Sequence, residues 1–431
     1  MAAILARGPL RAFGSRDYSL YWTASVLSIM SHLMFFLFRG WLALELTDSA
    51  FMVTAVATAG EIPSFIFSMP GGVLADRISR KAMLVAAESF TVVVLLVFAL
   101  MIAADQMNIW YLLGLTTLLG IVFALAIPAR AAIVPNLVPR EDIINGVALS
   151  SIMFSGGMLI GPAIAGGLLD VFGAPVAFSV AAAISVVSVL VLIPVHTGQT
   201  IRTVERSIRS AWVDTVEGIA YMFRHQVIFG LMAIAFVAIV LGSPYQAVLP
   251  VFARDILDSG ALGLGILGAA GGAGSIIASL SVAAFHGPAL MRNFIITSPI
   301  AFAFFVIAFA MSTSFSFSAA MAFGAGFSFQ LVLVASTARV QILIADELRG
   351  RIAAARSMSW GAAPLGFLLL GAMAEQLGTP IATAIMGAAT LAFSLLVILT
   401  FTALRRSHQI HTLDTSPTPH PFGDGPGRGA C

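Results

Sequence analysis

The feature that most constrains this 431-residue chain is a series of long apolar runs separated by short polar breaks. A helix needs about 20 apolar residues to cross a hydrocarbon layer about 30 Å thick, because each residue rises about 1.5 Å. Only 10% of the residues are charged, whereas soluble domains carry about 25%. The runs are also too long and continuous for the alternating strands of a β-barrel. The sequence therefore predicts an all-α integral membrane protein with many spans.

Twelve transmembrane helices are expected, in two pseudo-symmetric six-helix bundles. The spans lie near 18–44, 51–72, 83–104, 109–129, 147–169, 174–195, 227–250, 261–285, 293–313, 316–342, 357–377 and 380–403. The longest polar connection falls between the sixth and seventh spans. The expected divisions are an N-terminal bundle (1–195), a cytoplasmic linker (196–226), a C-terminal bundle (227–403) and a cytoplasmic tail (404–431). The tail is rich in Pro, Gly, Ser and Thr, a composition typical of disorder.

The distribution of charge predicts the orientation. If the N-terminus is placed inside, nearly all of the 22 Lys and Arg residues fall in cytoplasmic segments, and Arg254 is the one arginine expected in an outer loop. Loops that contact the cytoplasm are enriched in Lys and Arg. The outer loops instead carry the acidic residues Asp48, Asp105, Asp170, Asp255, Asp258 and Glu375. We therefore expect a multi-pass protein of a bacterial plasma (inner) membrane, with both termini in the cytoplasm.

An internal repeat relates the fifth and eleventh spans. A shift of 205 residues aligns Gly161 with Gly366 and Asp170 with Glu375. The same shift aligns the pairs Gly166/Gly371, Gly173/Gly378 and Pro175/Pro380. Parallel repeats of this kind are known in transporters.

The strongest local signal is the segment GGVLADRISRKAML, between the second and third spans. Gly72 is expected to permit a tight exit from the second span, because glycine tolerates unusual backbone angles. Asp76 lies among basic residues, which are Arg77, Arg80 and Lys81. The segment is either a solvated positive-inside loop or a switchable contact of Asp76 with a helix end.

This segment resembles the signature loop of the major facilitator superfamily, Gly-x-Leu-Ala-Asp-Arg-x-Gly-Arg-Lys, with Ser79 in place of the second glycine. The phrases RDYSLYW, GWLALELTDSA, PARAAIVPNLVPREDIINGVAL, YQAVLPVFARDIL and DELRGRIAAARSM resemble the branch that includes siderophore exporters and macrolide-type efflux proteins. The resemblance implies alternating access. It also implies that Asp76 closes the cytoplasmic side by contacting the inner end of the eleventh span, where Arg356 could add an ion pair.

The fifth span carries GGMLIGPAIAGG, which resembles the antiporter motif of that superfamily with Ala165 replacing one glycine. The matching positions are Gly157, Gly161, Pro162 and Gly166. Glycines four residues apart let helices approach closely, so the alternative is a purely packing role. Gly268 and Gly272 in the eighth span form a similar pair, interpreted as packing.

Ionisable residues inside spans are costly and are functional candidates by default. His32 and Glu61 lie near the middle of the first and second spans, and Arg39 lies two turns beyond His32. Arg39 either holds an anionic substrate, pairs with Glu61 or extends toward the membrane surface. His32 and Glu61 are either proton-coupling groups or neutral, hydrogen-bonded core residues. Glu88 is interpreted as structural, and no proton role is assigned to Arg130.

Three polar residues of the C-terminal half are candidate substrate contacts. They are Tyr245 and Gln246 in the seventh span and Gln330 in the tenth. The spans that carry them line the cavity in the superfamily that the chain resembles. The alternative is that they only hydrogen-bond neighbouring helices.

These observations favour a proton-coupled exporter of amphiphilic, drug-like or siderophore-like small molecules. An importer or uniporter of a small metabolite on the same fold remains open. A membrane-embedded enzyme or redox protein is disfavoured, since the sequence has no P-loop, no His-Glu-x-x-His and no Gly-x-Ser-x-Gly motif. Expected partners are the substrate, protons and the lipid bilayer, with no cofactor, metal or nucleic acid. The chain is expected to work as a monomer.

Overall fold

A computed structural model describes residues 10–197, 220–284, 288–344, 352, 356 and 359–401. Within these residues, ten helices are long and apolar enough to cross a membrane. One of them, Asn145–Leu192, contains two helices, and α14 (Ala363–Leu377) has 15 described residues. With these two additions, the helices correspond one by one to the twelve predicted spans. The prediction of an all-helical membrane fold is confirmed.

The N-terminal half is built from five long helices and three short 3₁₀ turns. They are η1 (Arg11–Gly14), α2 (Arg16–Thr47), α3 (Ala50–Arg77), α4 (Arg80–Ala103), α5 (Ile109–Ile133), η2 (Val134–Asn136), η3 (Arg140–Asp142) and α6 (Ile143–Leu192). Four of the helices begin at a side chain that accepts a hydrogen bond from a first-turn N–H. These caps are Ser15, Ser49, Ser79 and Asn108. Such residues satisfy N–H groups that have no partner within the helix, which sets where each helix begins.

The expectation for Gly72 is wrong. The second span does not end there, because α3 continues to Arg77 and stops at Ile78, which has extended backbone angles. A β-carbon at Gly72 would meet no atom within 4 Å, so neither a turn nor a close contact requires glycine at this position.

The C-terminal half contains α8 (Gln226–Val237), α9 (Leu249–Val251), α10 (Gly260–Ala284), α11 (Pro288–Ala310), α12 (Phe315–Leu343), α14 and α15 (Thr379–Thr400). Its first span is not the single α-helix that the sequence predicts. Between α8 and Ile256 the backbone passes through two π-helical turns and one 3₁₀ turn, η4 (Ala238–Gly242), η5 (Ser243–Gln246) and η6 (Phe252–Ile256). Pro244 and Pro250 lie in this segment, and proline has no N–H for a regular helical hydrogen bond.

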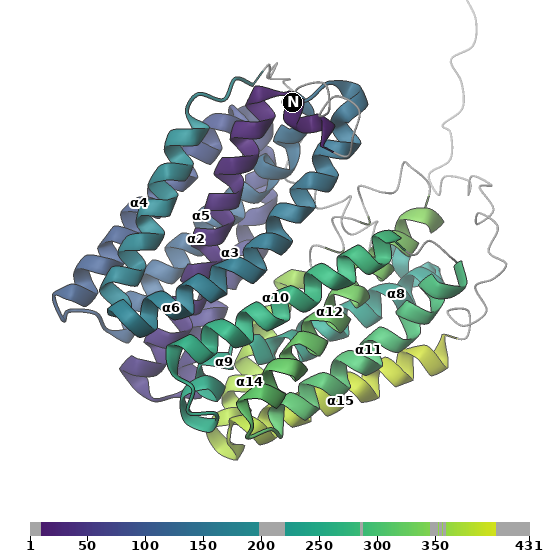
Figure 1. Cartoon of the computed structure of the whole chain (residues 1–431). Helices are drawn as coiled ribbons and strands as arrows, with labels where there is room; N and C mark the ends of the chain where they lie inside the picture. Colours follow the sequence, from purple (N-terminus) through teal and green to yellow (C-terminus); the bar gives the residue numbers. More distant parts are fainter. Residues whose placement is uncertain are drawn as a thin grey trace, which may run out of the picture.

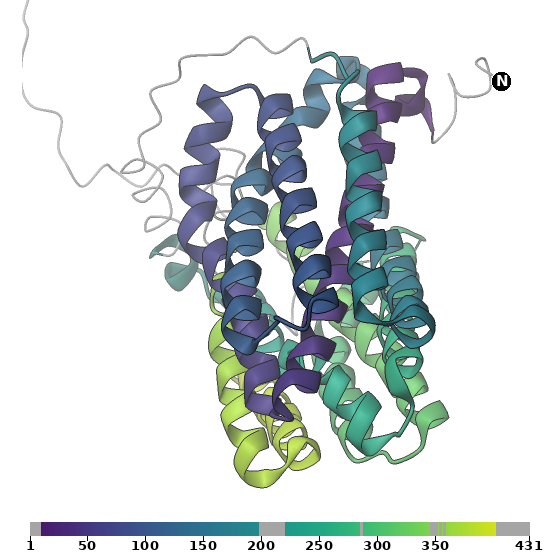
Figure 2. The same cartoon turned by 90° about the vertical axis from the view of Figure 1, so that its left-hand side faces the viewer.

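The two groups of helices pack against each other along α6 and α10 (Figure 1). The contact depends on glycine, since a β-carbon on Gly166 would lie 2.6 Å from the Cα of Gly265. A β-carbon on Gly272 would lie 2.3 Å from the carbonyl oxygen of Met158. Turned by 90°, the N-terminal helices stand in front of the C-terminal group (Figure 2). Gly272 therefore has the packing role expected for it, and the surface on which it packs is α6.

The two halves repeat the same turns. Gly173 and Gly378, equivalent in the sequence repeat, have φ of 74° and 83° and separate the last two helices of each half. Asp48 and Asp258 have φ of 49° and 46°, and each is followed by a serine at the start of the next long helix. A positive φ is uncommon outside glycine, and aspartate tolerates it better than most residues. The repeat therefore extends to backbone conformation.

Acidic and basic residues separate along the molecule. We call the end where α2 begins and α15 ends the terminal end, and the end that carries Asp48 and Asp258 the hairpin end. At the terminal end the described basic residues include Arg16, Arg77, Arg80, Lys81, Arg130, Arg292 and Arg356. At the hairpin end, Arg254 is accompanied by Asp105, Asp170, Asp255 and Glu375. Arg254 lies in the last turn of its span, in η6, rather than in a loop as expected.

Candidate functional site

The first candidate group is an ion pair between α2 and α3. Arg39 Nη2 lies 3.7 Å from Glu61 Oε1, so the alternative in which these two residues meet is the one observed. The Arg39 side chain is 4% exposed and that of Glu61 is 34% exposed. The guanidinium carbon also lies 4.5 Å from the ring centroid of Phe36, within cation–π distance. Arg39 Nη2 has no hydrogen-bond partner among the described residues, which leaves a buried donor beside a half-exposed carboxylate.

Two glycines make this pair possible. A β-carbon on Gly60 would lie 1.9 Å from Arg39 Nη1, so any other residue there would displace the guanidinium. On the other side, a β-carbon on Gly120 would lie 2.3 Å from the carbonyl oxygen of Gly60. α5 therefore packs tightly behind the segment of α3 that carries Glu61. Sequence reasoning missed Gly60, because glycine is common in membrane helices and nothing marks it except its position beside Glu61.

Glu61 lies on the face of α3 that meets the other half. Residues four, seven and eleven positions apart share one helix face, which places Thr54, Glu61 and Phe65 together. A β-carbon on Gly371 of α14 would lie 1.9 Å from Thr54 Oγ1. A β-carbon on Gly361 would lie 2.2 Å from Phe65 Cδ2. The carboxylate therefore sits between two points at which α3 touches the C-terminal half.

His32 occupies the wall of a cavity inside the N-terminal half. Its ring stacks on Phe123 with centroids 3.9 Å apart. The cavity is small and lies between α2, α4 and α5, and its polar lining is Ser28, Ser31, His32, Glu88 and Thr91. No hydrogen bond of the His32 ring to another described residue is found, so the hydrogen-bonded alternative is not the arrangement seen here.

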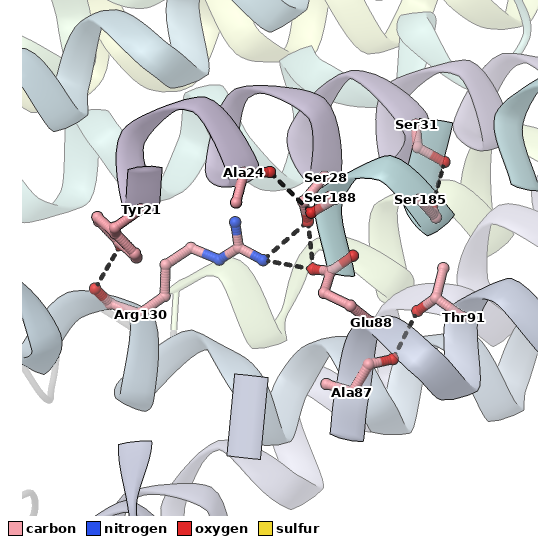
Figure 3. A network of polar contacts seen from close by, with 10 residues as sticks. All are labelled: Tyr21, Ala24, Ser28, Ser31, Ala87, Glu88, Thr91, Arg130, Ser185 and Ser188. Carbon is pink, nitrogen blue, oxygen red and sulfur yellow. Dashed lines mark hydrogen bonds and ion pairs between the residues drawn. The ribbon is translucent and has the colours of Figure 1, made fainter. Parts of the chain in front are cut away.

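A second ion pair of the same half joins α4 and α5 nearer the terminal end (Figure 3). Arg130 Nη2 donates to Glu88 Oε1 and to Ser28 Oγ, each at 2.9 Å, and Ser28 Oγ donates to the same carboxylate oxygen. Glu88 is 7% exposed. Tyr21 anchors the same turn of α5 by donating to the carbonyl oxygen of Arg130 at 3.0 Å. The sequence did not reveal this pairing, since Glu88 and Arg130 lie 42 residues apart with no shared motif.

The candidates of the C-terminal half differ in exposure. Tyr245 is 3% exposed, and its ring packs 5.8 Å from that of Phe309 and 6.3 Å from that of Phe302. Gln330 Nε2 donates to Ser279 Oγ on α10 at 3.1 Å, and Gln246 is half-buried. In this conformation Tyr245 and Gln330 therefore contact neighbouring helices, and their contact with substrate stays a prediction.

The basic residues after α3 bind helix ends of their own half. Arg80 Nη1 donates to the carbonyl oxygen of Ala132 at 2.6 Å, and Lys81 Nζ donates to that of Ile193 at 2.5 Å. Arg356 donates to Thr337 Oγ1 on α12. The side chain of Asp76 and most of residues 345–358 lie outside the described residues, so the expected contact of Asp76 with the eleventh span stays a prediction.

The hairpin end carries polar bonds that cross between the halves. Arg254 Nη2 lies 2.8 Å from Asp48 Oδ1, and its Nη1 donates to the carbonyl oxygen of Leu44 at 3.2 Å. Ser49 Oγ donates to Glu375 Oε2 at 3.1 Å, which brings a carboxylate of α14 to the first turn of α3. Sequence reasoning noted these charges as orientation signals and did not pair them across the halves.

The motif of the fifth span serves two packing surfaces. β-Carbons on Gly157 and Gly161 would lie 2.7 Å from Ile29 and 3.1 Å from Leu33, both on α2. Gly166 instead faces Gly265 of the other half, and a β-carbon on Gly265 would lie 2.7 Å from the Pro162 carbonyl oxygen. The motif thus tightens the N-terminal half and also forms part of its contact with the C-terminal half.

Solved structures of membrane transporters share this fold of two packed helical bundles. A POT family transporter solved with 5-aminolevulinic acid superposes with a TM-score of 0.70 at 14% identity, covering 91% of this chain and 97% of that one. A bacterial homologue of the lysosomal transporter Spinster, solved inward-facing and occupied, gives a TM-score of 0.69 at 13% identity, covering 93% of this chain and 97% of that one.

The chain belongs to the transmembrane secretion effector family of the major facilitator superfamily, whose model matches residues 7–422. It is 25% identical to the staphyloferrin A transporter of Staphylococcus aureus over 358 residues, 82% of this chain and 89% of that protein. It is 24% identical to macrolide efflux protein A of Streptococcus pyogenes over 260 residues, 59% of this chain and 63% of that protein. The protein is therefore a membrane transporter of the secretion and efflux type, not an enzyme.

Proposed function

We propose that the protein exports amphiphilic small molecules from a bacterial cell by proton-coupled alternating access, as a monomer. The similarity to a siderophore transporter and to macrolide efflux proteins supports export of drug-like or siderophore-like compounds. In this proposal the bundles 1–195 and 227–403 rock against each other around a central substrate site.

The Arg39–Glu61 pair is the observation that carries the proposal. A carboxylate inside a membrane protein is expensive, and its usual uses are ion or proton transfer. Glu61 faces the C-terminal half and is 34% exposed, so it can exchange a proton with the space between the halves. Arg39 is buried beneath it and offers an unused donor. Protonation of Glu61 releases the guanidinium, which couples the proton to the state of the site.

The proposed orientation places the terminal end in the cytoplasm. That end carries most of the described Lys and Arg residues, and cytoplasmic loops are enriched in them. The bonds from Arg254 to Asp48 and from Ser49 to Glu375 then hold the outer side together in this conformation. In the opposite conformation, a contact of Asp76 with the start of the eleventh span closes the cytoplasmic side.

Transport into everted membrane vesicles tests the proposal. Vesicles containing the protein are offered a panel of macrolides, dyes and siderophores, with and without an imposed pH gradient. Accumulation of at least one class that requires the gradient and disappears in Glu61→Gln supports proton-coupled export. Accumulation that ignores the gradient contradicts the coupling, and the absence of accumulation with uptake into intact cells indicates an importer.

A further inference from the structure

Two carboxylates at the hairpin end occupy equivalent places in the two halves. The internal repeat aligns Asp170 with Glu375. Each lies near the end of the fifth helix of its half, three residues before the glycine of positive φ, which is Gly173 or Gly378. Both carboxylate residues are exposed, so they are not needed to fill the interior of their own half. Their contacts with the opposite half therefore decide what they do.

Glu375 contacts the start of the second span of the opposite half. Its Oε2 accepts a hydrogen bond from Ser49 Oγ at 3.1 Å and another from the backbone N–H of Phe51 at 3.5 Å. Ser49 is the N-cap of α3, and Phe51 lies in the first turn of that helix. The first N–H groups of a helix have no partner within it and carry partial positive charge, which favours a carboxylate there. Glu375 therefore supplies the N-terminus of α3 with an acceptor from the other half.

Asp170 lies at the start of the equivalent span of the C-terminal half. A β-carbon on Gly260 would be 3.5 Å from Asp170 Oδ1, and Gly260 is the first residue of α10. Gly260 corresponds to Ala50, the first residue of α3, because each follows an Asp-Ser pair. Each carboxylate thus lies beside the N-terminus of the second helix of the opposite half. The two places are related by the axis along the membrane normal that relates parallel repeats.

Between these two places the first and seventh spans meet on the same axis. In this part of the repeat the shift is 210 residues, which relates Asp48 to Asp258. The same shift relates Gly40 to Pro250, and a β-carbon on Gly40 would lie 3.1 Å from Pro250 Cγ. A contact between two equivalent residues lies at the axis that relates them. The hairpin end is therefore closed by a central crossing of α2 and α9 with one carboxylate on either side.

Arg254 is the asymmetric part of this closure. The shift of 210 residues places Leu44 at the equivalent position, and Arg254 Nη1 donates to the carbonyl oxygen of Leu44 itself at 3.2 Å. Its Nη2 lies 2.8 Å from Asp48 Oδ1. Because leucine cannot form the matching ion pair, this contact exists once, whereas the carboxylate contacts are present on both sides of the axis.

Each carboxylate makes a small contribution because it is exposed. A charge at an exposed helix N-terminus changes an equilibrium by a factor of about two to five. Asp170 and Glu375 lie on opposite sides of the axis, so a separation of the halves at the hairpin end breaks both contacts in one movement. Independent contributions to one equilibrium then multiply, to about four- to twentyfold for the pair.

We propose that Asp170 and Glu375 form a symmetric latch, in which each carboxylate holds the N-terminus of the second helix of the opposite half while the hairpin end is closed. Both contacts release together when that end opens. The inference rests on the alternating access of the proposed function. It adds Asp170 and the joint release of the two sides to that cycle.

Thiol labelling tests the latch without substrate or gradient. Thr54 is fully buried where α3 meets α14, since a β-carbon on Gly371 would lie 1.9 Å from its Oγ1. Thr54→Cys combined with Cys431→Ser gives a full-length protein with one thiol at this contact. In detergent, N-ethylmaleimide alkylates the thiol at a rate proportional to the fraction of molecules open at the hairpin end. Mass spectrometry of the intact protein follows the reaction.

Three variants are compared in this background. We expect Glu375→Gln to raise the alkylation rate about two- to fivefold. Asp170→Asn should raise it by a similar factor although it lies on α6, away from Thr54, because both sides release in one movement. Asp105→Asn is the matched control, since Asp105 is an exposed acid of the same end in the connection between α4 and α5. It should keep the parent rate.

The outcomes separate the latch from its alternatives. An unchanged rate in Asp170→Asn overturns the joint release, and unchanged rates in both variants overturn the latch. An equal rise in Asp105→Asn shows a general effect of charge and also overturns it. Unfolding midpoints equal to that of the parent confirm that these exposed substitutions leave the fold intact. Vesicles that fail to export while the alkylation rates change as expected contradict the proposed function and leave the latch standing.

Discussion

The two halves of the molecule share a backbone plan but bury different chemistry. Both contain the left-handed turns at Asp48 and Asp258 and at Gly173 and Gly378. The N-terminal half adds two ion pairs within its spans, Arg39–Glu61 and Glu88–Arg130. In the described C-terminal half the buried polar side chains are serines and threonines, together with Tyr245.

The hydroxyls of that half accompany a cluster of rings formed by Tyr245, Phe252, Phe302, Phe309 and Phe329. The two halves therefore share the same turns, whereas the charged residues within spans are concentrated in the N-terminal half. We interpret the N-terminal half as the site of energy coupling and the C-terminal half as the part that recognises and packs around the substrate.

The largest effect is expected from Glu61→Gln. Because glutamine cannot carry a proton, gradient-driven export should fall to the level of vesicles without the protein. The matched change in the other half is Gln330→Ala, which removes the hydrogen bond to Ser279 but should leave the response to the gradient intact. If both variants lose the same share of gradient-driven export at equal protein levels, coupling is not confined to the N-terminal half.

Arg39→Met should lower the free energy of unfolding by about 2–3 kcal/mol. Removing one member of a buried pair usually costs about 3–5 kcal/mol, and the exposure of Glu61 reduces that figure here. Thermal unfolding of the purified protein in detergent measures the loss. Adding Glu61→Gln should recover part of it, because no charge is then left unpaired. Strictly additive losses in the double-mutant cycle would show that the pair contributes nothing.

Phe309→Leu probes the ring cluster of the C-terminal half. Its ring lies 4.8 Å from that of Phe252 and 5.8 Å from that of Tyr245, so the change should cost about 1 kcal/mol in stability. The order in which compounds are exported should change while the dependence on the pH gradient stays. If the variant exports the same compounds in the same order as the parent but depends less on the pH gradient, the C-terminal half takes part in coupling, which contradicts our assignment.

Asp76→Asn tests the proposed contact of Asp76 with the start of the eleventh span, in the other half. A carboxylate at a helix N-terminus is favoured by about 0.3–1 kcal/mol, enough to shift two near-equal conformations several-fold. The variant should insert normally, favour the conformation open at the terminal end and transport more slowly. Cross-links between cysteines introduced across that end report the shift, and the native sequence has a single cysteine, Cys431. Unchanged cross-linking together with normal export would show that this loop only sets the orientation of the spans in the membrane.

Arg254→Gln should have the smallest effect. Its bond to Asp48 joins the halves at the hairpin end, but Asp48 is 81% exposed, and exposed pairs contribute about 0.2–1 kcal/mol. Cross-links across the hairpin end should form slightly less often in the variant. The difference should vanish at high salt, where exposed charges are screened. A salt-independent loss would show that packing of the arginine stem is responsible.

Much of this structure was predictable because lipid restricts what a sequence can contain. Charged residues are rare in spans, so Arg39 and Glu61 are conspicuous in the sequence. Pairing with Glu61 is one of the alternatives expected for Arg39, and it is the one observed. Close packing of Gly157 and Gly161 was also expected, because small residues four apart form a smooth helix face.

The remaining features depend on contacts between distant segments. Glycine is required at position 60 because the Arg39 guanidinium lies against it, and no local sequence pattern indicates that contact. The pairing of Glu88 with Arg130 depends on how α4 lies against α5, which hydropathy does not specify. The irregular backbone around Pro244 and Pro250 does not follow from hydropathy, which predicts one continuous helix there, although two prolines in one span indicate a disrupted helix.

The Arg39–Glu61 pair also has an electrical consequence. With Glu61 ionised the pair is neutral, and with Glu61 protonated it carries one positive charge from Arg39. A positive charge that moves from the outer to the inner side of an energised bacterial membrane gains about 2.3 kcal/mol per 100 mV. If the proton enters from outside in the proposed cycle, the voltage assists that step directly. Export of an uncharged compound would then generate a current, measurable on a supported membrane even without a difference in pH.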